Sequence, residues 1–452
     1  MPSTDRKPRV AVLADSDTRW KWGALTAHRI LAADSAPVPA LDGYLLRGRA
    51  TPTPRQLTEV GVRADTLREV TGVEFLEALR EEPYDVVVLA LVGGGVQAML
   101  HGLAHAWRGR ARRPVVVTGY VGVVYEKLAD GLLLRHGADV VLANSRQDAE
   151  RFRAVYEGVG ADASSVVETA LPFLGGERYA PHDQHDQHDQ HDPHIPYTVV
   201  FAAQPSVPVT RADRSHLLGR LIRHAQRHPA REVLLKLRSR PGEHTTHIEE
   251  LPYQKLAQKA GGLPPNLRLV YGHMGEVLDR TDLLVTVSST AALESLHRRI
   301  PTAILTDVGI RETLGNHHFI GSGCLASFDQ LDAGHVPEPD AHWLARQGVA
   351  SDGDYAHAFD AARERVAELR ARPELPPLAP YYTPVTAPGY QPGILARHHL
   401  APDGAPLPGA PANTEVSGVR RAVRGAMRDA ARGAYRHGVQ RVAPVIRRMG
   451  EL

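Results

Sequence analysis

Cysteine and lysine are both scarce in this chain of 452 residues. Cys324 is the single cysteine, which excludes an internal disulfide and a cluster of thiolate metal ligands and indicates a reducing compartment. Lysine occurs only at Lys7, Lys21, Lys127, Lys236, Lys255 and Lys259, so arginine supplies most of the positive charge. The formal net charge is only +2, and we therefore expect no nucleic-acid partner.

Long apolar runs are absent as well. No stretch approaches the roughly eighteen apolar residues that a membrane-spanning helix needs. The N-terminal sequence reaches a strand-like run at once, without the apolar segment and cleavage site of a secretory signal. We expect a cytoplasmic protein, either free or peripheral at the inner face of the membrane.

Short apolar runs alternate with helix-like segments along most of the chain, which is too long for one core. Expected strands of the first half are Arg9–Ala14, Tyr84–Leu91, Pro114–Thr118 and Asp139–Ala143, with a helix over Trp22–Ala33. Those of the second half are Tyr197–Ala202, Arg231–Leu237, Leu267–Tyr271, Leu283–Val287 and Thr302–Leu305, with helices over Arg214–Gln226 and Ala291–Arg299. Continuous Val/Leu runs separated by helices are typical of parallel sheets covered on both faces. The pattern predicts an α/β protein of two doubly wound, Rossmann-like domains facing a central cleft, with a C-terminal helical extension.

Composition divides the chain into six segments. We expect a first domain over 1–180, a His/Asp/Gln-rich linker over 181–196, a second domain over 197–350, a return helix over 351–372, a mobile Pro/Gly-rich linker over 373–414 and a basic amphipathic helix over 415–452. The first linker repeats His-Asp-Gln, which indicates either repeat expansion or loose binding of zinc or nickel. In the last segment arginine recurs at every fourth position from Arg420 to Arg436. That face predicts contact with anionic lipid, or else a solvated or self-packing helix.

Three hydroxyl residues follow the predicted strand Leu283–Val287. Ser288, Ser289 and Thr290 stand where a helix begins, at the carboxyl end of a parallel strand. This position places donors at the positive end of a helix dipole, which attracts an anion such as a phosphate. The alternative is that Ser289 or Thr290 only caps the helix.

Basic and polar residues also follow two other predicted strands of the second half. Lys236 and Arg238 lie on alternate positions at a strand's carboxyl end, where they are placed to neutralise a diphosphate leaving group. Gln204 follows the first strand of the second half and is expected at the same edge of the sheet.

Glu294 lies one turn into the helix after the hydroxyl residues, and Pro301 follows seven residues later. With these residues the chain resembles glycosyltransferases of the GT-B superfamily, nearest to uncharacterised bacterial members. The resemblance implies that Glu294 holds the ribose of a nucleotide-sugar donor, that Ser288, Ser289 and Thr290 hold its diphosphate, and that a basic residue at 236 or 238 assists. It also implies that His273 borders the donor, that the helix before the phosphate turn covers 277–282, and that neither a metal nor a cofactor is needed. A surface glutamate and a polar turn histidine are the alternatives.

Acidic residues in the first half are the candidates for a catalytic base. Asp15, Asp17, Glu126 and Asp130 stand in or near loops expected at carboxyl ends of strands, as do Gly93–Gly95. An inverting transfer needs a group that removes the acceptor's proton. We favour Asp17 or Glu126; the alternative is that these are loop or capping residues.

The sequence therefore predicts a metal-independent glycosyltransferase that moves a sugar from a nucleotide-sugar donor to an envelope or polysaccharide acceptor, either a glycan or a lipid-linked acceptor. Two alternatives share the architecture. One is a sugar-nucleotide epimerase, and the other is a binding or scaffold protein without catalytic activity.

Overall fold

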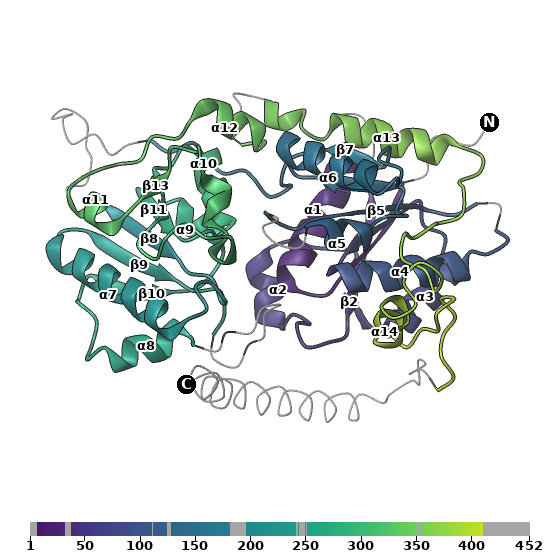
Figure 1. Cartoon of the computed structure of the whole chain (residues 1–452), viewed down its shortest axis with the longest axis horizontal. Helices are drawn as coiled ribbons and strands as arrows, with labels where there is room; N and C mark the ends of the chain where they lie inside the picture. The colour runs from purple at the N-terminus through teal and green to yellow at the C-terminus, as the bar shows by residue number, and fades with distance from the viewer. Residues whose placement is uncertain are drawn as a thin grey trace. The chain divides into compact units, whose positions relative to one another are not determined.

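The computed structural model describes residues 7–31, 38–110, 112–123, 128–180, 196–240, 243, 249, 251–349 and 354–409 (Figure 1). Contacts divide these residues into two compact units. Unit 1 comprises 7–173, 346–348 and 354–409, and unit 2 comprises 174–345 and 349. Glu126, most of the His/Asp/Gln-rich linker and the predicted helix over 415–452 lie outside the described residues.

Unit 1 is built on a seven-stranded sheet in the order β3-β2-β1-β4-β5-β6-β7, with every neighbouring pair parallel. Its strands are β1 (Arg9–Ala14), β2 (Ala40–Leu46), β3 (Thr66–Val70), β4 (Val86–Ala90), β5 (Val115–Gly119), β6 (Val140–Ala143) and β7 (Val166–Glu168). Its connecting helices are α1 (Asp17–Leu31), α2 (Pro54–Val60), α3 (Gly72–Glu81), α4 (Gly93–Ala106), α5 (Leu128–Leu133) and α6 (Arg146–Gly158). Each strand is followed by a crossover helix or loop, as a doubly wound sheet requires.

Both faces of this sheet are buried. Along β1, Ala11 and Leu13 belong to one core cluster, whereas Val10, Val12 and Ala14 belong to the other. Because successive side chains of a strand point to opposite faces, two buried faces require the continuous apolar runs seen in the sequence.

The segment after residue 353 packs on unit 1. The predicted return helix is found as η3 (Asp354–Ala356) and α13 (Asp360–Ala371), and α13 lies against α1 (Figure 1). The prediction of a mobile linker from 373 is wrong for residues 373–409, because α14 (Gln391–Ala396) contacts α4 and buries Ile394 and Leu395. Apolar residues spaced among the prolines hold this segment in place.

Unit 2 is built on a six-stranded sheet in the order β10-β9-β8-β11-β12-β13, again parallel throughout. Its strands are β8 (Thr198–Ala202), β9 (Glu232–Lys236), β10 (Leu267–Val270), β11 (Leu283–Thr286), β12 (Thr302–Leu305) and β13 (Leu325–Ala326). Its helices are α7 (Arg211–Arg227), α8 (Tyr253–Lys259), α9 (Met274–Leu278), α10 (Ala291–His297), η1 (Glu312–Leu314), η2 (Asn316–Phe319) and α11 (Phe328–Asp332), and α12 (Ala341–Arg346) follows. The predicted α/β class with two doubly wound sheets is confirmed.

Several elements differ from the sequence predictions. Strands β2, β3, β7 and β13 were missed, because β2 contains Asp42 and Gly43, β3 is a mostly exposed charged strand, and the other two are very short. Helix α1 begins at Asp17 rather than Trp22, and α10 ends at His297 rather than Arg299. The helix expected over 277–282 is instead α9, which begins three residues earlier and ends four residues earlier.

Candidate functional site

Strand order reverses once in each sheet, and in unit 2 the reversal lies between β8 and β11. Chain connections leave these two strands in opposite directions, so loops diverge at their carboxyl ends. Open α/β sheets bind ligands at such a point. Four of the residues singled out in the sequence follow strands of this sheet, namely Gln204, His273, Ser288 and Glu294, and Lys236 is the last residue of another strand.

Gln204 and Ser288 join the two strands at the reversal. The Ser288 backbone N–H donates to Gln204 Oε1 over 3.1 Å, and the Ser288 hydroxyl donates to the Leu314 carbonyl over 2.5 Å. Ser288 is 1% exposed. Its hydroxyl therefore fixes the turn from within, rather than facing a ligand as the sequence suggested.

The start of α10 is capped by one hydroxyl, not three. The Ser289 hydroxyl accepts from the Ala291 N–H over 3.3 Å, and Thr290 makes no side-chain capping bond. Both residues are half-buried, unlike Ser288. They remain the hydroxyls of this turn that a ligand can reach, but α10 is only seven residues long, so its dipole is short.

Glu294 lies in the first turn of α10 and is 9% exposed. Arg298, at the C-cap of the same helix, holds α10 to α9: its Nη1 donates to the Gly275 carbonyl over 3.2 Å and pairs with Asp279 Oδ1 at 2.5 Å. His273 is the N-cap residue of α9, and its ring lies so close to Gly275 that a Cβ there would be 2.8 Å from it. Arg298 thus fixes the two helices that carry Glu294 and His273.

Lys236 and Arg238 are both found at the carboxyl end of β9. Lys236 is the last residue of the strand, 8% exposed, and its Nζ donates to the Leu237 carbonyl over 2.9 Å. Arg238 lies just beyond the strand and is half-buried. The structure therefore places two basic side chains at the same edge of the sheet as the hydroxyl turn.

In unit 1 the strand order reverses between β1 and β4. Asp15, after β1, accepts from the Val92 N–H on one carboxylate oxygen and pairs with Arg19 on the other, each over 3.0 Å. Asp17 is the first residue of α1 rather than a loop residue. Gly93–Gly95 form the first turn of α4, and Asp130 accepts hydrogen bonds from Tyr382 and Tyr390.

Two residues at this edge of unit 1 were not singled out in the sequence. Arg135 is buried and donates to the carbonyls of Leu91, Gly119 and Gly131, and burial lowers the pKa of its guanidinium. Asp148, the third residue of α6, is 4% exposed, and burial raises the pKa of its carboxyl to about 6. No local motif marks either residue; the one available signal was the Ser-x-x-Asp spacing from Ser145, which indicates a helix start.

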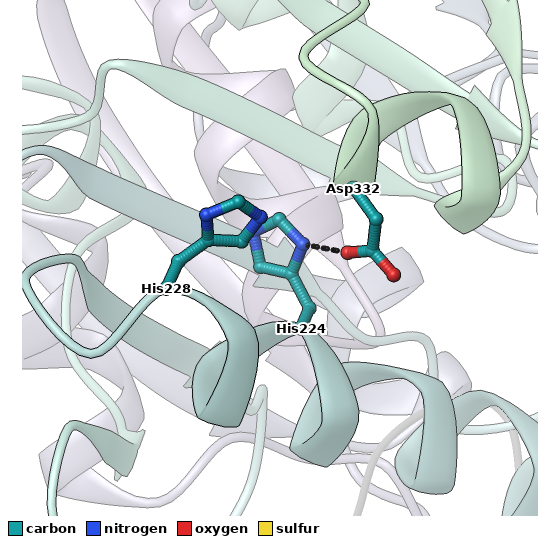
Figure 2. A group of neighbouring side chains, drawn as sticks. All are labelled: His224, His228 and Asp332. Carbon is teal, nitrogen blue, oxygen red and sulfur yellow. Dashed lines mark hydrogen bonds and ion pairs between the residues drawn. The ribbon is translucent and has the colours of Figure 1, made fainter.

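His224, His228 and Asp332 form the one group of possible metal ligands found among the described residues, with donor atoms within 4.8 Å of one another (Figure 2). His224 Nδ1 lies 2.6 Å from Asp332 Oδ1. Arg227 and Arg220 approach Asp332 Oδ2 at 3.2 and 3.5 Å.

Hydrogen bonding accounts for most of this group without a metal. Burial lowers the pKa of His224, so the ring is neutral, donates from Nδ1 to Asp332 and offers Nε2 to Arg231, 3.4 Å away. A cation at Nδ1 would move the proton to Nε2, facing the arginine donor. We therefore interpret the group as a latch between α7 and α11, not a metal centre.

A family model matches residues 10–369 of the chain, and its description reads "Putative glycosyltransferase (DUF6716)". The chain belongs to this family. The match extends across both sheets and ends within α13. The glycosyltransferase resemblance expected from Glu294 and the serine turn is thereby confirmed, and no curated protein matches the chain.

Several solved structures are similar to this chain at low sequence identity. A "putative UDP-N-acetylglucosamine 2-epimerase" from Listeria monocytogenes is 14% identical, with a TM-score of 0.50, covering 82% of this chain and 99% of its own. MnaA from S. aureus in complex with UDP is 12% identical with a TM-score of 0.49, covering 80% and 95%. HepE from Anabaena in complex with UDP-glucose is 14% identical with a TM-score of 0.43, covering 80% and 98%.

Among the described residues, no helix is both long enough and apolar enough to cross a membrane.

Proposed function

We propose that this protein is a metal-independent glycosyltransferase that binds a nucleotide-sugar donor at the carboxyl edge of unit 2. Family membership supports the reaction class. The observation that carries the site is the hydrogen bond between Gln204 and Ser288 across the strand reversal, which fixes the turn in front of Glu294. The donor diphosphate lies against Ser289, Thr290, Lys236 and Arg238 in this proposal, while Ser288 supports the turn.

In this proposal Glu294 binds the ribose of the donor, and His273 lies beside the bound donor. A carboxylate that accepts two hydroxyl hydrogens from a diol selects a nucleotide over a free phosphate. Its low exposure favours this role, because a nearly buried carboxylate is little screened by water.

The proposed acceptor is a glycan or lipid-linked glycan of the envelope or of a polysaccharide, and the base proposed from the sequence is Asp17 or Glu126. The arginine-rich segment 415–452 is proposed to hold the protein at an anionic membrane surface. Deleting 415–452 should reduce binding to vesicles containing phosphatidylglycerol and leave donor binding unchanged.

An epimerase is the second candidate, because the Listeria structure with this fold is described as one. It would convert the donor sugar without an acceptor. Incubation with UDP-N-acetylglucosamine, followed by separation of products, distinguishes the two: a new UDP-sugar isomer indicates epimerisation, whereas UDP release indicates transfer or hydrolysis.

Glu294→Ala tests the donor site. Loss of a charged hydrogen bond to ribose should weaken binding by roughly 1–3 kcal/mol, or about 5- to 150-fold in Kd. Thermal shift against a panel of nucleotide sugars finds the donor, and calorimetry then gives Kd for the wild type, Glu294→Ala and the exposed control Glu338→Ala. Equal affinity of all three proteins would remove Glu294 from the site.

A further inference from the structure

Residues 378–400, here called the strap, lie beyond the residues matched by the family model and belong to unit 1. Within the strap, α14 contacts α4 (Figure 1). A Cβ on Gly94, the second residue of α4, would be 3.5 Å from Ile394, and a Cβ on Gly72, the first residue of α3, would be 3.5 Å from the His398 carbonyl. Helices α3 and α4 begin just after β3 and β4 end. The strap therefore lies at the carboxyl edge of the sheet, where open α/β sheets bind ligands.

One carboxylate holds two tyrosine rings of the strap. The Tyr382 hydroxyl donates to Asp130 Oδ1 over 3.1 Å, and the Tyr390 hydroxyl donates to Asp130 Oδ2 over 3.0 Å. The two rings meet edge to face, with centroids 5.3 Å apart. Burial, followed by the hydrogen bond to Asp130, raises the pKa of Tyr382 to about 12, so this phenol stays protonated and remains a donor. Asp130 therefore fixes both rings in one orientation.

The ring of Tyr390 is accessible to a ligand. Tyr390 is 42% exposed, whereas Tyr382 is half-buried. Other side chains of the strap anchor it in the core of unit 1, namely Leu378, Ile394, Leu395 and Leu400. An exposed ring that is already held in one orientation loses little conformational entropy when a ligand binds, so it is pre-organised for contact.

The surface around Tyr390 suits a neutral ligand that is rich in hydroxyl groups. The C–H groups of a sugar ring carry a small positive charge and pack on the negative face of an aromatic ring. The phenol oxygens of Tyr382 and Tyr390, which donate to Asp130, keep lone pairs that can accept from ligand hydroxyls. The charged groups that affect the pKa of Tyr390 are Asp130 and Arg397, one of each sign, which favours a neutral saccharide over an ion.

His398 extends this surface toward the strand reversal of unit 1. The side chain is half-buried, and burial lowers its pKa, while the Asp15 carboxylate opposes the shift. This effect places His398 near Asp15, which follows β1 at the reversal. A neutral imidazole can both donate to and accept from hydroxyl groups.

We propose that the strap binds the acceptor of this protein, an oligosaccharide, with one sugar ring packed on Tyr390 and with hydroxyl groups bonded to the phenol oxygens and to His398. The inference rests on the proposed function, because it supplies a surface for the acceptor of that reaction. The surface lies wholly within unit 1. Because the strap lies outside the region that the family model matches, it selects the acceptor and leaves the reaction class to the matched region.

The test measures binding of glycans by the full chain in the absence of a donor. A glycan array that includes bacterial surface polysaccharides finds the best ligand, and calorimetry gives its Kd. Tyr390→Ala removes the ring and a hydrogen-bonding oxygen and should weaken binding about 20-fold. Tyr390→Phe keeps the ring and should weaken binding only about 3-fold. The control Val385→Ala, at a residue of the strap that is 88% exposed, should match the wild type.

Two further readouts separate a binding role of Tyr390 from a supporting one. If Tyr390 only braced the strap through its hydrogen bond to Asp130, Tyr390→Phe and Tyr390→Ala would weaken glycan binding equally. The donor Kd should be unchanged in both variants, because the donor is proposed to bind unit 2. Melting temperatures confirm that each variant is folded.

The possible results distinguish this inference from the proposed function. Absence of glycan binding on the array, or a Kd of Tyr390→Ala within about twofold of the wild type, would overturn the role of the strap and leave the proposed function standing if a donor binds. Equal losses in Tyr390→Phe and Tyr390→Ala would also overturn it. Glycan binding that depends on the Tyr390 ring, in a protein that binds no nucleotide sugar, would instead overturn the proposed function and keep the saccharide surface.

Discussion

In both units a hydrogen bond connects the ends of the two strands at which the strand order reverses, but the acceptor group differs between the units. In each unit a side chain after the first strand accepts a backbone N–H that follows the strand across the reversal: Asp15 from Val92, and Gln204 from Ser288. The unit 2 acceptor is a neutral amide. The unit 1 acceptor is a carboxylate that also pairs with Arg19.

This difference agrees with the charges expected at each site. A neutral tie in unit 2 adds no negative charge beside Lys236 and the hydroxyl turn, where a diphosphate is proposed. Unit 1 has a carboxylate at the corresponding position, and its edge also contains the buried Arg135, which donates to three carbonyls. The comparison shows one fold with a neutral amide acceptor at the strand reversal of unit 2 and a paired carboxylate at that of unit 1.

Arg135→Met should have the largest effect on stability. It removes the donors of three buried carbonyls, and we expect a loss of about 3 kcal/mol in the free energy of unfolding. Denaturant unfolding followed by fluorescence measures it, with exposed Arg108→Met as the control. A loss below about 1 kcal/mol would show that the unit 1 edge does not depend on Arg135.

His224→Ala should cost about 2–3 kcal/mol, because it creates a cavity and removes the donor to Oδ1 of the buried Asp332 carboxylate. Burial lowers the pKa of His224, so the unfolded chain takes up a proton first as pH falls below about 6.5. The stability of the wild type should therefore decrease as the pH falls through this range, and the stability of the variant should decrease less. The exposed control His342→Ala should keep the wild-type profile.

Zinc provides a separate check of the latch. Because His224 and Asp332 are hydrogen-bonded to each other without a metal, adding zinc or EDTA should not change the wild-type melting temperature. An increase of several degrees that is lost in His224→Ala would instead identify a metal site.

Asp15→Ala should cost about 2 kcal/mol, because it removes the acceptor of the Val92 N–H and the carboxylate that pairs with Arg19. Asp15→Asn should restore part of that value, since an amide oxygen still accepts from Val92. Thermal unfolding compares the two variants. Equal losses in both would show that the ion pair with Arg19, rather than the tie across the strands, provides the stability.

Gln204→Ala should have the smallest effect on stability, about 1 kcal/mol, because it removes a neutral hydrogen bond. It should nevertheless weaken donor binding, since the turn that carries Ser289 and Thr290 loses its support. Calorimetry with the donor and the exposed control Gln226→Ala check this pair of effects. Unchanged donor affinity would show that the hydrogen bond between Gln204 and Ser288 does not contribute to donor binding.

The fold was largely predictable because burial on both faces of a parallel sheet imposes long Val/Leu runs. Strand β4, Val86–Ala90, lies within the predicted run Tyr84–Leu91. Strand β3 escaped prediction because it is an edge strand whose residues Thr66–Glu69 are exposed, so no apolar run was needed there. The packing of residues 373–409 was not predicted, because the apolar residues there are isolated among prolines and do not recur at the spacing of a helix or a strand.

The hydroxyl turn and the glutamate of the proposed donor site could be singled out in the sequence because they are contiguous. The stretch from Leu283 to Pro301 contains the strand, the turn and the glutamate in one run of sequence, so their spacing carries the signal. The pairing of Ser288 with Gln204 was not predictable, since 84 residues separate them.

By itself, the sequence determined the class of fold, the family resemblance and the residue types available along the edge of unit 2. Those properties depend on local periodicity and spacing. Only the tertiary structure decided which polar side chains pair with each other, such as Ser288 with Gln204 and His224 with Asp332. Burial and hydrogen bonding are set by residues distant in the sequence, and no local pattern records them.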